Sequence, residues 1–406
     1  MNIILIVVDA LRKDRVGAYI NSKNSLTPNI DELAKNGTML MQHTTVLNGS
    51  APVIVSLFTG CYPSTHGIHE NGYKFPNNFK TITEHLNEYN YTTCGVVSSG
   101  IISSLYNFNK GFKYFYDNSK YDKLTLWAKK QGTIRYKIRK FLRNALFKFG
   151  LFNTFVVTYD KTNKRILNWL DNNYKEKFFL YIQYFDIHED TYGERNKSKD
   201  KVKNYDENIK IIDSAIGELI NKVKKLNIFN DTIFIITADH GEDLEEAQHG
   251  RKISEDEFSV PCIFHKPELI PIKKVDNLTR AIDILPTILD INGFTLPNNI
   301  DGVSIKKSIF ENVNLVDEVF LESYPLFGDI KGIRTKEWLY LLRNGNEEEL
   351  YNIMKDHKLK SNIAKENKDL CLKFKIKLKK HFSIKYEPGE RDEYTKQMLA
   401  KLGYVK

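Results

Sequence analysis

Residues 2–9 of the sequence are NIILIVVD, an apolar run that is rich in β-branched side chains and ends in an aspartate. A membrane helix needs about 20 apolar residues, and a signal peptide needs a basic start and a small-residue cleavage site. The run has none of these features. It therefore predicts a strand that is buried on both faces, in a protein that we expect in the cytoplasm.

Runs of the same kind recur downstream, at residues 92–97, 178–185, 232–237 and 260–264. Before the run at 232–237, apolar residues follow one another at steps of three and four from Ile209 to Val223, which predicts an amphipathic helix. Alternation of buried strands with helices is typical of a doubly wound α/β domain with a mostly parallel central sheet.

The apolar runs become shorter after about residue 292. Residues 319–322, 332–335 and 338–342 predict short strands with polar breaks between them, and a Lys-rich stretch at 369–381 predicts a helix. We expect a small antiparallel sheet with a C-terminal helix. The chain thus divides into a main domain at 1–310 and a small α+β subdomain at 311–406.

The positive charge of the chain is concentrated in one segment. The formal net charge of the 406 residues is +9, and residues 118–150 alone hold ten Lys or Arg against one acid. A nucleic-acid-binding protein would spread such charge over a whole face, so no nucleic-acid partner is expected. We interpret residues 118–160 as a basic helical insert. Its apolar face, from Ile134 to Phe149, either packs on the domain or contacts an anionic membrane surface at the inner face.

Acids and histidines follow three of the predicted strands. Ligands of α/β sheets bind beyond the carboxyl ends of the strands, and these residues lie at that edge: Asp9, Asp186, His188, Asp239 and His240. A single Asp at a strand end is often only a helix N-cap. Three such strand ends together indicate a site for a divalent metal, because carboxylate and imidazole are its usual ligands.

A serine precedes a helix-like apolar stretch at 53–58. It lies in the segment NGSAP at residues 48–52. Ser50 either caps this helix or uses the positive field of the helix start, where a neighbouring metal would activate its hydroxyl as a nucleophile. On the local sequence alone, the cap is the simpler interpretation.

Several motifs together make the sequence resemble the sulfatase family of the alkaline phosphatase superfamily. They occur in family order at residues 6–14, 27–34, 56–67, 184–188, 237–242, 249–250 and 349–352. The resemblance implies an alkaline-phosphatase-like fold. It also implies metal-dependent, in-line attack on a sulfate or phosphate ester, with a small-molecule, glycan or lipid-linked anionic ester as substrate.

The family pattern assigns roles to particular residues of this chain. Counting back ten residues from Gly60 identifies Ser50 as the nucleophile. The implied ligands of one divalent ion (calcium, zinc, manganese or magnesium) are Asp9, Ser50, Asp239 and His240.

Other family positions lie near the substrate. His188 and His249 are implied to bind the ester oxygens, protonate the leaving group or complete a second metal site. Lys252 is expected to neutralise the substrate, and Asp186 to orient His188 or to ligate a second ion.

Two departures from the family pattern affect the chemistry. Sulfatases that oxidise their nucleophile to formylglycine have an Arg four residues after it, and this chain has Ile54 there. Modification of Ser50 is therefore doubtful, and a plain alkoxide is expected. Ala10 replaces a second Asp and removes one metal ligand. The segment beginning at Cys61 imitates a sulfatase motif, but it lies after Gly60 and has Thr65 where Arg is required.

These features leave alternatives to a sulfatase. A phosphatase, a phosphodiesterase or a phospho-head-group transferase would use an unmodified Ser50, and the missing Arg favours these. A non-catalytic binding module is a third interpretation, against which stands the joint presence of Asp9, Ser50, Asp239 and His240.

Overall fold

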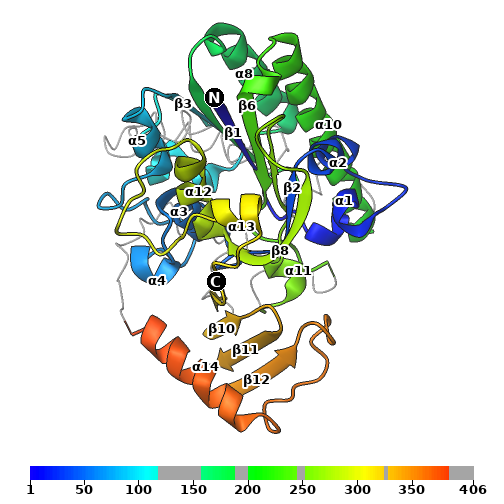
Figure 1. Ribbon diagram of the computed structural model, residues 1–406, viewed down its shortest axis with the longest axis vertical. Helices are drawn as coiled ribbons and strands as arrows, with labels where there is room; N and C mark the ends of the chain where they lie inside the picture. The colour runs from blue at the N-terminus through cyan, green and yellow to red at the C-terminus, as the bar shows by residue number, and fades with distance from the viewer. Residues whose placement is uncertain (118–156, 188–199, 245–251, 324–327, 384–406) are drawn as a thin grey trace, which may run out of the picture.

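The computed structural model describes residues 1–117, 157–187, 200–244, 252–323 and 328–383. Their main body is an eight-stranded sheet with helices on both faces, and a four-stranded sheet with one helix lies beside it (Figure 1). The predicted α/β architecture is confirmed, including the small antiparallel sheet and its C-terminal helix. None of the described helices is long and apolar enough to span a membrane.

The large sheet has the strand order β4-β3-β5-β1-β6-β7-β2-β8. Its strands are β1 (Asn2–Val8), β2 (Thr38–Thr44), β3 (Thr92–Val97), β4 (Tyr114–Tyr116), β5 (Phe178–Tyr184), β6 (Thr232–Thr237), β7 (Cys262–His265) and β8 (Lys273–Arg280). The neighbours β3/β4, β3/β5, β1/β5, β1/β6 and β2/β8 are parallel, and β7 runs antiparallel to both β6 and β2.

Helices cover both faces of this sheet. They are α1 (Gly17–Ile20), α2 (Pro28–Lys35), α3 (Ser50–Thr59), α4 (Pro63–His66), α5 (Ile82–Asn87), α8 (Tyr159–Asn173), α10 (Lys201–Lys225), α11 (Glu255–Phe258), α12 (Ile284–Ile291) and α13 (Lys306–Glu311). Short 3-10 turns lie at Lys13–Arg15, Gly100–Ile102, Ser104–Tyr106, Phe229–Asp231 and Ala281–Asp283.

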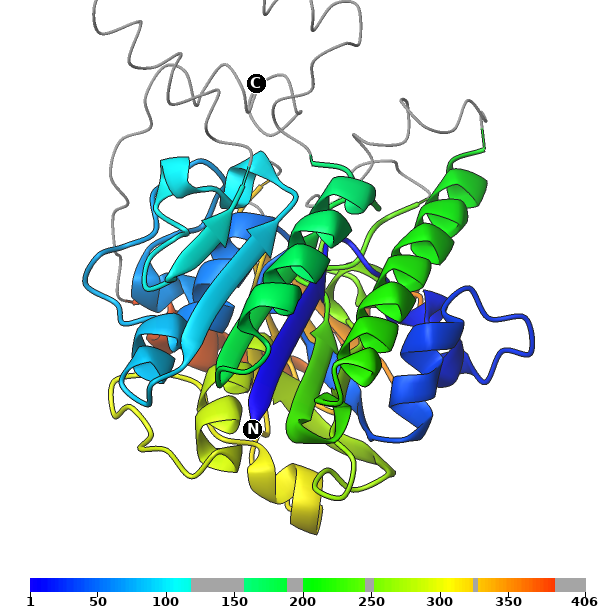
Figure 2. The ribbon, with the colours of Figure 1, turned by 90° about the horizontal axis from the view of Figure 1, so that it is seen from above.

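Burial of the central strand β1 on both faces explains why residues 3–8 are apolar. Ile3, Leu5 and Val7 face one core together with α3, α5 and α12, whereas the alternate residues face a second core with α2, α8 and α10. Figure 2 shows α8 and α10 lying across one face of the sheet. Because both faces of β1 are buried, its residues from Ile3 to Val8 are all apolar, and the next polar residue is Asp9, which follows its end.

The small sheet contains β9 (Val319–Glu322), β10 (Ile330–Arg334), β11 (Trp338–Arg343) and β12 (Glu347–Asn352), all paired antiparallel. One of its faces is covered by α14 (Lys368–His381) through Cys371, Phe374 and Leu378. On the other face, Leu321 and Leu341 share a core with Val46 and Phe258 of the main body. The two sheets therefore form one packed unit, and the division at 310/311 stays a prediction.

Some expected elements lie outside the described residues or differ from expectation. Most of the basic insert predicted at 118–160 is not described, apart from the start of α8. The expected strand at 260–264 begins later, at Cys262, because Val260 and Pro261 belong to the preceding loop. Strands β2, β4, β8 and β12 were not expected from the sequence.

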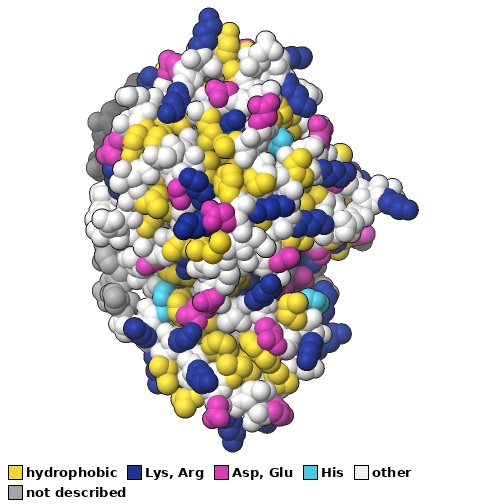
Figure 3. Space-filling model, viewed as in Figure 1, with side chains coloured by type: hydrophobic (Ala, Val, Ile, Leu, Met, Phe, Trp, Pro, Cys, Tyr) yellow, Lys and Arg dark blue, Asp and Glu magenta, His cyan; other side chains and the backbone are white. Residues whose placement is uncertain are grey.

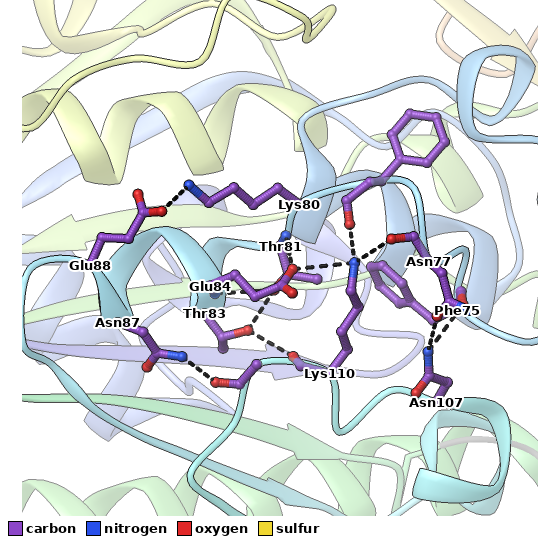
Figure 4. A network of polar contacts seen from close by, with 12 residues as sticks. Phe75, Asn77, Lys80, Thr81, Thr83, Glu84, Asn87, Glu88, Asn107 and Lys110 are labelled. Carbon is purple, nitrogen blue, oxygen red and sulfur yellow. Dashed lines mark hydrogen bonds and ion pairs between the residues drawn. The ribbon is translucent and has the colours of Figure 1, made fainter.

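A polar network fastens the loop between α4 and α5. The Lys110 ammonium donates to the carbonyls of Asn77 (3.0 Å) and Phe79 and pairs with Glu84 (3.3 Å), as Figure 4 shows. Thr83 donates to the carbonyl of Lys110 at 2.9 Å. Only 16% of the Lys110 side chain is exposed, so this cation is held by its partners rather than by water.

Candidate active site

The ends of β1 and β6 place two carboxylates side by side. These strands are parallel neighbours with Val7 opposite Thr237, so Asp9 and Asp239 leave the sheet at the same edge. Asp9, Asp239 and His240 are each fully buried, and they offer ligand atoms that all lie within 4.8 Å of one another. The structure thus brings together three of the predicted metal ligands.

Ser50 joins this group from the start of α3. Its Oγ donates to Asp9 Oδ2 at 3.0 Å and lies 3.4 Å from His240 Nε2. Gly49 occupies the N-cap position of α3, and no side chain caps the helix there. Ser50 is the first residue of the helix itself. The interpretation of Ser50 as a helix cap is therefore wrong, because its hydroxyl points toward the carboxylate rather than back along its own helix.

The electrostatics of the group favour a cation. Burial, and then the neighbouring Asp239 carboxylate, raise the pKa of Asp9 well above its ordinary value of 3.8. Asp9 Oδ1 and Asp239 Oδ2 are buried and have no hydrogen-bond partner among the described residues. Two adjacent buried carboxylates with unused oxygens fit a divalent ion, which would replace the missing donors and compensate the charge.

His240 presents a defined nitrogen to the site. Its Nδ1 lies 2.7 Å from the carbonyl of Gly241, which can only accept, so Nδ1 carries the proton. The lone pair is then on Nε2, the nitrogen that faces Ser50. A carbonyl that fixes the tautomer in this way is typical of metal-binding histidines.

Two neutral side chains complete the support of Asp9 and Ser50, and the sequence analysis did not identify either. Gln183 donates to Asp9 Oδ2 at 3.1 Å from the end of β5. Asn71 accepts from the backbone N–H of Ala51 at 3.0 Å, in the loop that Lys110 fastens. Gln183 could have been noticed, because it is the one amide in the buried run 178–185, whereas nothing in the loop sequence marks Asn71.

A left-handed turn directs the chain away from Asp9. Ala10 has a φ of 58°, a conformation that costs an L-residue roughly 1 kcal/mol. Its N–H donates to Asp239 Oδ1 at 3.1 Å, and its carbonyl accepts from the hydroxyl of Tyr205 at 2.7 Å. Ala10, which stands where the family pattern implies a second Asp, thus places a methyl group on a strained turn that Asp239 and Tyr205 hold in place.

Two of the predicted substrate residues have polar partners outside this group. Asp186 follows β5 and accepts from the N–H of Tyr159 at the start of α8, at 3.0 Å. Lys252 pairs with Asp243 at 2.5 Å, and its carbonyl accepts from Asn48, two residues before the nucleophile, at 3.0 Å. Lys252 is therefore tied to the segment that leads into Ser50. The roles of both residues stay predictions.

His188 and His249 lie outside the described residues, so their roles also stay predictions. Ile54 is fully buried in the apolar core along α3. Cys61 follows the end of α3 and is likewise buried, with its Sγ 3.6 Å from the carbonyl of Thr59.

The doubly wound sheet, with its serine and carboxylates gathered at the strand ends, defines an alkaline-phosphatase-like protein. The chain belongs to the sulfatase family, whose model matches residues 1–294. A second model, described as N-sulphoglucosamine sulphohydrolase, C-terminal, matches residues 248–384. The sulfatase family predicted from the sequence motifs is thus confirmed.

Individual relatives resemble different shares of the chain. Arylsulfatase K of Rattus norvegicus is 34% identical over 33% of this chain, and the match spans only 24% of that protein. Human steryl-sulfatase is 23% identical over 80% of this chain and 72% of its own length. The crystal structure of Ps i-CgsB has a TM-score of 0.77 at 25% identity and covers 99% of this chain and 97% of that one. Another structure holds the same protein in complex with k-i-k-neocarrahexaose.

Proposed function

We propose that this chain hydrolyses sulfate esters with Ser50 as the nucleophile and with a divalent ion as cofactor. The observation that carries the proposal is the contact of Ser50 Oγ with Asp9 Oδ2 at 3.0 Å, beside buried Asp239 and His240. A serine that serves only the fold would not need two buried carboxylates and an imidazole around its hydroxyl.

The residues that would hold the ion are Asp9, Asp239 and His240 through Nε2, with Ser50 Oγ as the fourth donor. A divalent ion bound there would lower the pKa of the Ser50 hydroxyl and polarise a non-bridging ester oxygen. Gln183 keeps the Asp9 carboxylate oriented, and the carbonyl of Gly241 keeps the lone pair of His240 toward Ser50.

The protein side chains carry the bond exchange. Ser50 Oγ attacks the sulfur in line and gives up its proton, for which Asp9 Oδ2 is the nearest acceptor at 3.0 Å. The new Oγ–S bond replaces the bond to the ester oxygen. The departing alcohol takes a proton that we assign to His188 or His249, and water then releases sulfate from Ser50. Ser50 is the first residue of α3, so the positive end of the helix dipole lies next to the nucleophile and favours the negative charge that develops there.

We propose an anionic ester on a sugar or glycan as the substrate class. Support comes from Ps i-CgsB, which was crystallised with a neocarrahexaose, and from the fold that the two proteins share. Lys252 is the candidate for neutralising the substrate, since its backbone is bonded to Asn48 next to the nucleophile segment.

A phosphate ester is the second candidate. Ile54 stands where formylglycine-forming sulfatases need an Arg, and Ala10 removes one carboxylate from the metal site. Both departures favour an unmodified serine, which phosphatases, phosphodiesterases and head-group transferases use. A non-catalytic module would not account for two adjacent buried carboxylates beside Ser50.

Two measurements test these proposals. The purified protein is assayed with an aryl sulfate, an aryl phosphate and a bis-aryl phosphodiester at several concentrations of manganese, calcium, zinc and magnesium. The mass of the peptide that contains Ser50 then distinguishes serine from formylglycine. Turnover of the aryl sulfate by an unmodified Ser50 is expected. Faster turnover of a phosphate ester would favour the second candidate, and absence of all three activities would contradict both.

A further inference from the structure

The outer face of α14 carries large apolar side chains that the described part of the chain leaves uncovered. Leu372 is 57% exposed and Ile376 is 60% exposed, and they lie four residues apart, on adjacent turns of the same helix face. The opposite face holds Cys371, Phe374 and Leu378, which pack on the small sheet. Figure 1 shows α14 at the lower edge of the molecule, with the small sheet on one side of it. The helix is therefore apolar on two faces, of which one is covered.

Lysines surround the exposed apolar pair. At 100° per residue, Leu372 and Ile376 lie at the centre of the outer face. Around them lie Lys368, Lys373, Lys379 and Lys380, together with one exposed acid, Asp369. All four lysines are exposed and form no ion pair with any described residue. In Figure 3, lysine and hydrophobic side chains lie side by side over the region where α14 runs.

Two other lysines of α14, in contrast, form ion pairs with residues of the small subdomain. Lys375 pairs with Glu348 of β12 at 2.9 Å, and Lys377 pairs with Glu318, which precedes β9. These two lysines attach the helix to its own sheet. The other four have no such partner and are directed away from it, so the fold does not account for them.

We propose that the outer face of α14 is a docking surface for an anionic lipid membrane. The lysines supply attraction to acidic headgroups, and Leu372 with Ile376 supplies apolar area that can enter the boundary between headgroups and acyl chains. An anionic polymer would use the lysines alone and would gain nothing from two aliphatic side chains at their centre. The apolar pair therefore distinguishes a lipid surface from a polysaccharide or a nucleic acid.

Charge complementarity also sets the expected salt dependence. Each lysine near an acidic bilayer increases the affinity about fivefold, and the effect is screened beyond about 10 Å at 0.1 M salt. The four lysines together should therefore change vesicle affinity by roughly two orders of magnitude or more. The docking surface is separate from the candidate active site, so it does not rest on the sulfatase proposal.

Co-sedimentation with vesicles tests the proposal with the full-length protein. Vesicles of phosphatidylcholine, with and without phosphatidylglycerol, are compared at low and high salt. We expect binding that requires phosphatidylglycerol and weakens with salt. A variant in which Lys368, Lys373, Lys379 and Lys380 are replaced by Gln should lose roughly several hundredfold in affinity. The double variant Leu372→Gln, Ile376→Gln should lose about tenfold or more.

Matched controls separate this surface from other basic parts of the chain. Four exposed lysines on α8 and α10 (Lys161, Lys164, Lys203 and Lys225) are replaced by Gln for an equal change in net charge. Exposed Ile20 (52%) and Ile272 (68%) are replaced by Gln as the apolar control. Both controls should bind vesicles like the unaltered protein. Because all these side chains are exposed, thermal unfolding should show intact folds.

Three results would overturn the proposal. The first is equal binding to phosphatidylcholine alone. The second is a loss of affinity in the control variants as large as in the α14 variants. The third combines two measurements. If the lysine variant binds immobilised heparin less tightly, and if Leu372→Gln with Ile376→Gln does not change vesicle binding, the surface would be assigned to an anionic polymer.

Discussion

The Ser50 hydroxyl is the one nucleophile at the described strand-end site, and its replacement gives the first prediction. Ser50→Ala removes the attacking atom and only two polar contacts, with Asp9 and His240. We expect the fold to be kept and turnover of the preferred ester to fall by a factor of about a thousand or more. Activity assays with thermal unfolding as a fold check measure both effects.

Cys61→Ala is the matched control for Ser50. Burial raises the pKa of the Cys61 thiol to about 11, so it is not a thiolate at neutral pH. Its removal should leave turnover near normal. An inactive Cys61→Ala together with an active Ser50→Ala would show that the assignment of the nucleophile by its spacing from Gly60 is wrong.

A second prediction at a single residue concerns Gln183, whose side-chain amide donates to the Asp9 carboxylate at 3.1 Å and orients it. Gln183→Met keeps the volume but removes the donor. Outer partners of metal ligands typically contribute 10- to 100-fold in metal affinity or activity, and we expect a loss in that range. Calorimetric titration with manganese measures it. Unchanged affinity and unchanged kcat would show that Asp9 does not depend on this bond.

The loop between α4 and α5 gives a prediction at the scale of the element. Lys110→Met leaves Glu84 and two carbonyls without their cation, so we expect unfolding free energy to fall by about 1–3 kcal/mol. Lys80→Met, which breaks the exposed pair with Glu88, is the control and should change little (Figure 4). Denaturant unfolding compares the two. Equal losses of unfolding free energy would mean that the burial of Lys110 does not increase its contribution to stability.

Prediction from sequence worked for elements whose burial is uniform. β1, β3 and β6 are buried along their whole length, so their apolar runs are continuous and unambiguous. β8 has the sequence KKVDNLTR at the edge of the sheet, and its half-exposed residues hide it. β2 is an interior strand, but Gln42 and the fully buried His43 interrupt its apolar run, and β4 is too short to give a pattern.

Some residues of the candidate active site could be predicted from the sequence, and others could not. Asp9, Asp239 and His240 could be predicted, because parallel strands bring their carboxyl ends to one edge and motif spacing identifies those ends. Asn71 could not, because its role depends on a loop conformation that Lys110 imposes from another part of the chain. The contact between Ser50 and Asp9 also depends on packing, since the local sequence favoured a helix cap.

Binding of a divalent ion concerns the whole molecule, because only the folded chain brings β1, α3 and β6 together. An ion present at about 100 times its dissociation constant should add about 2.7 kcal/mol to the unfolding free energy. We therefore expect chelation to lower the melting temperature and manganese or calcium to restore it. Asp239→Asn should abolish this response. A melting temperature that is insensitive to chelator and to every ion would argue against a metal site.

The contact between the main body and the small sheet gives a pH-dependent prediction. His69, after α4, donates from Nδ1 to Glu322 of β9 at 2.9 Å. Burial alone would lower the pKa of His69, but the hydrogen bond and charge of Glu322 raise it above its ordinary value of 6.5. A raised histidine pKa stabilises the fold fully below pH 6.5, and the contribution disappears as the pH rises through the folded-state pKa. The unfolding free energy of the unaltered protein minus that of His69→Gln should therefore fall with rising pH.

His85 provides a control of opposite sign within the same protein. Burial, and then Lys80, lower the pKa of His85, so the folded state disfavours its protonated form. For His85→Gln the same difference should rise with pH, because the unaltered protein loses stability as His85 is forced to take up a proton. Denaturant unfolding of both variants on either side of pH 6.5 measures the two slopes. If the slopes had the same sign, the pH response would come from the rest of the molecule, and the contact between His69 and Glu322 would not hold the small sheet against the main body.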